Sequence, residues 1–388
     1  MARLPELVPP PVELPEGAAA LRAEVREFLA HERKAGSWQP GVDTWLAGWD
    51  ERFSRKLARQ GWVGMTIPPQ YGGHGRGALE RYLVTEELLA AGAPVAAHWI
   101  ADRQIAPTLM RFGTEEQRKR FLPGIAAGEM YFAIGMSEPD SGSDLASVRS
   151  KAIKVNGGWE LSGTKVWTSG AHRAHAFFAL ARTSTQDEKN RHAGLSQLIV
   201  ELDSPGVTIR PIPLLTGAHH FNEVVLDKVF VPDALVLGEL GQGWRQVTSE
   251  LAFERSGPER YLSTFPLFVS LLGELAGTDL DAGRRGQLGG LLARYWTLRR
   301  MSLSVAGALD AGLAPDLAAA VVKDLGTRFE NEVIDGARLL LSVAADPGAE
   351  GNFARLLADA VQHAPGFTLR GGTNEILRGI VARGLGLR

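Results

Sequence analysis

The chain has 388 residues, of which 45% are hydrophobic and 22% are charged, and its formal net charge is −2. This length allows two or three domains, and the balanced charge excludes the basic surface typical of proteins that bind nucleic acid or anionic membranes. The absence of cysteine excludes disulfides, thiolate nucleophiles and cysteine-ligated metal centres. The proline-rich residues 1–15 lack the apolar stretch of a signal peptide, and no run approaches the roughly 18 apolar residues of a membrane span. We therefore expect a cytoplasmic protein.

The N-terminal part of the chain has the periodicity of amphipathic helices. Helical patterns cover residues 17–33, 50–60, 79–91 and 114–121. Thr114 stands where a side chain can cap the last of these helices. Residues 1–128 are therefore predicted to form an N-terminal helical domain.

The middle of the chain is built from short runs rich in β-branched and aromatic residues. Residues 156–158, Asn-Gly-Gly, separate two such runs and predict a β-hairpin. Further strand-like runs cover residues 176–181, 196–202, 207–212 and 224–231. Residues 129–236 are therefore predicted to form a small antiparallel β domain.

After Gly243 the helical period returns. One apolar stripe runs from Leu288 to Leu309 and a second from Val322 to Leu340. Two long amphipathic helices in series indicate an antiparallel bundle, and residues 237–388 are predicted to form a C-terminal four-helix-bundle domain. The fold class is α+β, in the order helical, β, helical.

The sequence lacks the short catalytic motifs of several enzyme classes. The sequence has no dinucleotide-binding glycine fingerprint after a strand, no P-loop, no zinc-protease helix motif and no nucleophile elbow. Ser162 and Lys165 have the spacing of a serine–lysine nucleophile but lie in a β segment, which favours a structural role. His219 and His220 could ligate a metal, but no further ligand stands at a suitable spacing. We expect a loop pair there and no metal.

Three segments combine small polar residues in a way that suits ligand binding. Residues 130–144 lead from an apolar run into a loop of Ser, Gly, Asp and Pro, which is either an ordinary turn or a ligand-binding loop. Residues 163–171 place an indole beside a hydroxyl, although a tryptophan is more often part of a core. In residues 370–378 a double glycine opens a helix, which suits an anion or is simply a helix start.

Together and in this order, the three segments resemble the acyl-CoA dehydrogenase family. Residues 113–123 and 222–232 also resemble family segments, and the resemblance extends from Glu24 to Leu387. The order of helical, β and helical domains is the same.

The resemblance implies where a cofactor and a substrate would bind. FAD would lie between the β domain and the C-terminal helical domain, and acyl-CoA would be the substrate. The cofactor-binding residues implied are Met136, Ser137, Trp167, Ser169, Gly372 and Thr373. Met136 and Ser137 would meet the flavin ring, Trp167 would pack on it, and Ser169 would hydrogen-bond near N5. Ser143 and Arg255 are the implied substrate-binding residues.

The reaction implied is an α,β-dehydrogenation in which a carboxylate removes the α-proton and the β-hydride passes to flavin N5. Many family members carry this glutamate directly before the Gly-Thr of the last segment, where this chain has Gly371. A second group places it on the helix after the β domain, and Glu254 falls at that position. We therefore expect Glu254 to be the base, with Glu375 as the spare candidate.

One departure from the family pattern leaves the assembly open. Homotetrameric members usually have an Arg-x-x-Phe-Gly segment that binds the FAD of a neighbouring subunit, and residues 277–286 do not match it. The chain is thus expected to form a homo-oligomer, or a heteromer with a second acyl-CoA dehydrogenase-like subunit. Electrons would pass to an electron-transfer flavoprotein. The alternatives are a subunit that is inactive alone and a flavin monooxygenase on the same fold.

Overall fold

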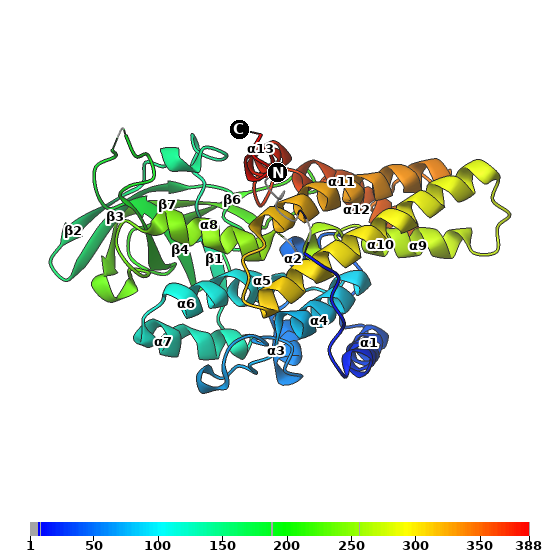
Figure 1. Cartoon of the computed structure of the whole chain (residues 1–388), viewed down its shortest axis with the longest axis horizontal. Coiled ribbons are helices and arrows are strands. Elements are labelled where there is room, and N and C mark those ends of the chain that lie inside the picture. The colour runs from blue at the N-terminus through cyan, green and yellow to red at the C-terminus, as the bar shows by residue number, and fades with distance from the viewer. Residues whose placement is uncertain (1–6, 8, 188, 256, 388) are drawn as a thin grey trace. The chain divides into compact units, whose positions relative to one another are not determined.

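The computed structural model (Figure 1) describes residues 7, 9–187, 189–255 and 257–387, and for residues 250–254 it describes the main chain only. The described chain divides into two compact units. The helical unit comprises Met1–Trp49, Gly77–Val95 and Ala252–Arg388, and the sheet unit comprises Asp50–Arg76 and Ala96–Leu251. The division into three domains at residues 128 and 236 remains a prediction.

Most helices of the sheet unit precede its strands. They are α3 (Glu51–Arg59), the 3-10 turn η1 (Pro69–Tyr71), α5 (Ala96–Ile100), the π-helical turn η2 (Ala101–Ile105), α6 (Ala106–Phe112) and α7 (Glu115–Ala126). Thr114 caps α7 as predicted, because its hydroxyl accepts a hydrogen bond from Gln117 N at 3.2 Å while the Gln117 side chain accepts from Thr114 N at 3.1 Å.

Seven strands form one sheet. They are β1 (Phe132–Gly135), β2 (Lys151–Val155), β3 (Gly158–Lys165), β4 (Ala176–Arg182), β5 (Leu195–Glu201), β6 (Val207–Ile212) and β7 (Phe221–Pro232). The strand order is β1-β4-β2-β3-β7-β6, with β5 paired to β4. The β2–β3 hairpin closes at Gly157, whose φ of +76° suits the glycine of the predicted turn. The sheet is mostly antiparallel, and β1 runs parallel to β4.

The core of the sheet unit is shared by its helices and its sheet. Ile105, Leu109 and Phe121 from the helices belong to the same buried cluster as Phe132 and Phe178 from the sheet. The rings of Phe121 and Phe132 pack edge to face, with their centroids 5.5 Å apart. The strands thus bury one of their faces against helices that precede them in the chain.

The helical unit contains the remaining helices. They are α1 (Ala18–Lys34), α2 (Thr44–Ala47), α4 (Ala78–Ala91), α9 (Phe265–Leu275), α10 (Ala282–Asp310), α11 (Asp316–Leu340), α12 (Asn352–Phe367) and α13 (Asn374–Gly384). α8 (Gly243–Glu254) contains the junction between the two units. The apolar stripes predicted for α10 and α11 are largely buried, and α9–α12 form the predicted four-helix bundle.

The buried Glu86 of α4 connects three helices of this unit. Its carboxylate pairs with Arg22 on α1 and with Arg299 on α10, the latter at 2.6 Å. No helix in the described part of the chain is both long and apolar enough to cross a membrane.

Candidate functional site

The first predicted segment lies where β1 ends. Met136 and Ser137 follow the strand directly and are half-buried. The carbonyl of Ser137 accepts a hydrogen bond from Val166 N at 2.9 Å. The first and second predicted segments, which are about 30 residues apart in sequence, are therefore neighbours in the sheet unit.

The second segment has an unusual backbone at Trp167. Its φ is +59°, a left-handed conformation that costs a bulky residue roughly 1–2 kcal/mol. The indole is 55% exposed and contacts Phe221 edge to face at 5.7 Å. Thr168 is fully buried and Ser169 is half-buried. An exposed ring and a hydroxyl therefore stand two residues apart at the end of β3.

A buried ion pair supports the first segment. Glu138 accepts hydrogen bonds from Lys165 Nζ at 2.8 Å and from the backbone N–H of Arg149 and Ser150 at 2.6 and 2.9 Å. Lys165 Nζ also donates to the Met136 carbonyl at 3.2 Å, and its side chain is fully buried. Burial alone would raise the pKa of Glu138, but the Lys165 charge and these hydrogen bonds lower it below its usual value. Burial lowers the pKa of Lys165 to about 8.

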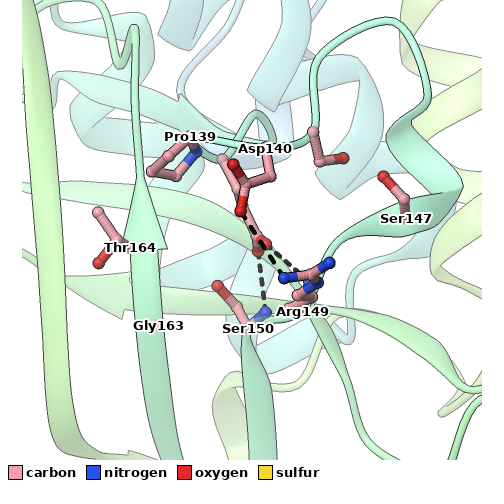
Figure 2. Close-up of a pocket in the computed structure, with 9 residues that line it drawn as sticks. Pro139, Asp140, Ser147, Arg149, Ser150, Gly163 and Thr164 are labelled. Atoms are coloured by element: carbon pink, nitrogen blue, oxygen red, sulfur yellow. Dashed lines mark hydrogen bonds and ion pairs between the residues drawn. The ribbon is translucent and has the colours of Figure 1, made fainter.

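Glu138 also lines a surface pocket. Figure 2 shows its lining, in which Asp140 and Arg149 point toward one another, with 3.7 Å between the carboxylate and the guanidinium. The pocket has a volume of about 210 Å³, below the roughly 300 Å³ at which drug-sized ligand sites begin. Ser143 is exposed in the same loop and is not part of the lining. This pocket alone cannot enclose FAD or acyl-CoA.

The third segment lies in the helical unit, beside Arg255. Arg255 Nε donates to the Gly371 carbonyl at 3.2 Å, and a side chain at Gly372 would meet the same guanidinium at 3.3 Å. Gly371 and Gly372 have φ of +69° and +85°, which favour glycine. The Thr373 hydroxyl caps α13 by accepting from Ile376 N at 3.4 Å. Arg255 and the Gly371–Gly372 turn are thus neighbours in the helical unit.

Of the two candidate bases, the structure describes the side chain of Glu375 but not that of Glu254. Glu254 is the last residue of α8, and its side chain lies outside the described residues. Glu375 is exposed in the first turn of α13, where hydrogen bonds from its own backbone N–H and from Thr373 hold its pKa below the usual value. That environment is typical of a carboxylate at a helix start.

The two weak motifs have structural roles in the described chain. Lys165 pairs with Glu138, and the Ser162 hydroxyl accepts from Lys228 N at 3.2 Å, so no serine–lysine pair forms. His219 Nε2 hydrogen-bonds Asn222 Oδ1 at 2.8 Å, and no group of three or more His, Asp or Glu among the described residues is placed to hold a metal ion. Both histidines lie in the loop before β7, as the sequence predicts.

Three buried side chains next to these segments were missed by the sequence analysis as site residues. Asn222 contacts the second segment, Glu138 lies within the first and binds Lys165, and Lys323 donates to the Gly372 carbonyl at 2.7 Å. All three are buried, Asn222 and Lys323 fully so. For Lys323 the sequence did offer a signal, because this charged residue directly follows the apolar residues 318–322.

The observed geometry fits the flavin that the resemblance implies. Trp167 presents an aromatic surface, and the Thr168 hydroxyl beside it is buried without a hydrogen-bond partner among the described residues. In the helical unit, a side chain other than hydrogen at Gly372 would crowd Arg255. An exposed aromatic ring with a spare hydroxyl in the sheet unit suits a planar ring of a cofactor, and a close backbone approach in the helical unit suits a phosphate.

Sequence models of known families match most of the chain. Residues 15–129 match the acyl-CoA dehydrogenase N-terminal domain, residues 133–229 the middle domain and residues 241–386 the C-terminal domain.

Individual proteins give the same result. The chain is 36% identical to acyl-CoA dehydrogenase IpdE1 of Mycobacterium tuberculosis over 94% of this chain and 97% of that protein. It is 35% identical to acyl-CoA dehydrogenase FadE34 of the same organism over 87% of this chain, a match that spans only 46% of FadE34. A solved structure described as the Tcur3481-Tcur3483 steroid ACAD superposes with a TM-score of 0.82 at 29% identity, covering 97% of this chain and 98% of that one.

The fold, the three segments and these matches agree along nearly the whole chain. An enzyme of this family is an FAD-dependent oxidoreductase that dehydrogenates acyl-CoA thioesters, and the exposed Trp167 ring and the spare Thr168 hydroxyl fit such a cofactor. The chain belongs to the acyl-CoA dehydrogenase family.

Proposed function

We propose that Glu254 is the base that removes the α-proton of an acyl-CoA thioester. The observation that carries this proposal is Gly371, which has no side chain and a positive φ at the position where many family members carry the catalytic glutamate. Arg255 supports it, because its hydrogen bond to Gly371 O brings the main chain next to Glu254 close to that position. A glutamate at the end of α8 can therefore replace one at position 371.

Other residues of the chain bind the cofactor and orient the substrate in this proposal. Bound FAD supplies the acceptor for the β-hydride. In this proposal Trp167 packs on the flavin, Met136, Ser137 and Ser169 hydrogen-bond it, and Gly372 and Thr373 bind it through the backbone and a hydroxyl. Ser143 and Arg255 orient the thioester. A base beside an apolar acyl chain is kept basic by exclusion of water.

The substrate in this proposal has a branched or ring-bearing acyl group. Gly257 stands three residues after Glu254, and Gly371 replaces a bulkier residue of other family members, so neither adds a side chain that would restrict the acyl group. The name of the similar solved structure, a steroid ACAD, points in the same direction. Electrons then leave to an electron-transfer flavoprotein.

A heteromeric assembly is the second candidate. The family's Arg-x-x-Phe-Gly segment has no counterpart in residues 277–286, where Thr278 instead closes the end of α9 through a hydrogen bond to Leu275 O. The similar solved structure carries two designations, Tcur3481 and Tcur3483. A partner chain that completes FAD binding would explain the missing segment.

The test is the visible spectrum of the chain before and after anaerobic addition of acyl-CoA. For Glu254→Gln we expect the flavin bands to remain and their bleaching to slow by roughly 10²–10⁴-fold, the usual contribution of a general base. Glu375→Gln is the matched control and should bleach at the wild-type rate. Unchanged bleaching in Glu254→Gln would rule out Glu254 as the base, and a colourless protein expressed alone would favour the heteromer.

A further inference from the structure

Trp167 holds its left-handed backbone without burying its ring. Only three non-glycine residues in the described chain have a positive φ: Asp43, Trp167 and Lys228. An aspartate tolerates that conformation through its short polar side chain, whereas a tryptophan does not. Because the Trp167 indole is 55% exposed, packing of the ring does not explain the conformation. Other contacts must hold this turn.

Those contacts come from Asn222, near the start of β7. The Asn222 carbonyl accepts from Thr168 N at 3.0 Å, and its side-chain Nδ2 donates to Thr168 O at 3.0 Å. Asn222 thus binds both main-chain polar groups of Thr168, the residue that follows Trp167. Its side chain is fully buried, so water does not compete for these bonds.

Two stacked histidines fix the orientation of the Asn222 carboxamide. His219 Nε2 lies 2.8 Å from Asn222 Oδ1, and His172 Nδ1 lies 3.1 Å from Asn222 Nδ2. The two imidazole rings stack with centroids 4.0 Å apart. Since Nδ2 can only donate, His172 accepts at Nδ1 and is neutral, and since Oδ1 can only accept, His219 carries its proton at Nε2. Each atom of the carboxamide therefore has a defined role.

Residues next to Asn222 contact the turn at two further points. Phe221, directly before Asn222, contacts the Trp167 indole edge to face, and Gly170 N donates to His220 O at 2.7 Å. The segment 220–222 therefore contacts Trp167, Thr168 and Gly170, the residues on both sides of Ser169.

We propose that Asn222 is a positioning residue that holds Trp167 in its left-handed conformation and so presents the indole and the Ser169 hydroxyl to the flavin. The inference rests on the proposed flavin contacts of Trp167 and Ser169. Asn222 itself touches neither cofactor nor substrate in this account. It acts through its hydrogen bonds to the main chain of Thr168.

Asn222→Asp tests the inference with almost no change in shape. The carboxylate keeps the acceptor for His219 but cannot donate to Thr168 O or His172, and it faces the carbonyl oxygens of Thr168 and His220. We expect the FAD dissociation constant to rise at least tenfold, with a changed visible circular dichroism spectrum of the bound flavin. Both readouts are independent of turnover.

Gln117→Glu is the matched control for lost stability. Gln117 is also a buried carboxamide of the sheet unit, and it donates to two carbonyls, Ala234 O and Val236 O, each at 2.8 Å. Its conversion to a carboxylate removes the same kind of hydrogen bond away from the Trp167 turn. We expect the FAD dissociation constant to stay within about twofold of wild type, whatever the loss in thermal stability.

Trp167→Gly separates the inference from the function on which it rests. Glycine adopts a positive φ freely, so in this background Asn222→Asp should change the FAD dissociation constant less than threefold. If Asn222→Asp matches the Gln117→Glu control, or acts equally in both backgrounds, only the role of Asn222 is overturned. If Trp167→Gly alone leaves FAD binding and the flavin spectrum unchanged, the flavin contact of Trp167 is overturned as well.

Discussion

At the scale of single residues, Glu330 on α11 is the most unusual carboxylate outside the proposed site. Its side chain is fully buried, Oε1 accepts from Ser263 N at 2.9 Å, and Oε2 has no partner among the described residues. Burial raises its pKa to about 7, even though the nearby Arg370 charge lowers it. Glu330 is therefore partly protonated in the folded protein near neutral pH.

This pKa shift has a definite sign for stability. The folded protein binds more protons than the unfolded chain between pH 4.5, the ordinary pKa, and pH 7, so the free energy of unfolding falls as the pH rises through this window. Glu330→Gln removes that dependence and keeps an oxygen for Ser263. We expect the variant to have the same free energy of unfolding as wild type near pH 5. At pH 8 its free energy of unfolding should be higher, by up to about 3 kcal/mol, as measured by thermal unfolding.

The control is Glu274→Gln on α9, which makes the same change of charge at an exposed position. Its stability should follow wild type across the pH range. A Glu330→Gln variant that is less stable than wild type at pH 8 would contradict the assignment of a protonated carboxyl.

At the scale of elements, a lysine of α11 binds the turn before α13. Lys323 is fully buried and donates to Thr368 O at 3.2 Å, Gly372 O at 2.7 Å and Asn374 Oδ1 at 2.8 Å. Arg370 in the same turn pairs with the buried Asp43. The turn that carries Gly371 and Gly372 is therefore anchored at both ends.

Replacing Lys323 by Met should release this turn. The variant removes the charged donor of all three acceptors, although Asn374 N still donates to Thr368 O and Thr327 Oγ1 to Asn374 Oδ1. We expect a loss of roughly 3 kcal/mol in the free energy of unfolding by guanidinium chloride, with weaker retention of FAD. Lys119→Met, at an exposed position of α7, is the control and should change stability by less than about 0.5 kcal/mol. An equal effect of the two substitutions would refute the anchoring role.

Several helices, turns and caps could be predicted from the sequence. The hairpin at Gly157, the Thr114 cap and the stripes of α10 and α11 follow from local patterns, and all are confirmed. The helical stretch 96–112 was missed, because it is buried on nearly all sides and has no amphipathic period. The partners of Lys165 and Lys323 come from residues 27 to 51 positions away, so no local pattern could reveal them.

At the scale of the whole molecule, the sheet does not have a core of its own. The buried cluster of the sheet unit joins strand residues such as Phe177 to Ile105, Leu109 and Leu122 of the preceding helices. A fragment of residues 129–236 lacks those helices. We expect it to show no cooperative thermal transition by far-ultraviolet circular dichroism, whereas residues 96–251, which include α5–α7, should show one. Cooperative unfolding of the shorter fragment would mean that the β domain is autonomous.

The interleaving of the two units also has a consequence during synthesis on the ribosome. Glu86 meets Arg22 at once, but its other partner, Arg299, lies 213 residues further along the chain. At 5–20 residues per second, Arg299 emerges roughly 10–40 s after Glu86. The sheet unit, which ends at Leu251, is complete before α10 is translated, while the part of α4 that packs against α10 stays without its partner. The helical unit is thus finished last, although its first helices are made first.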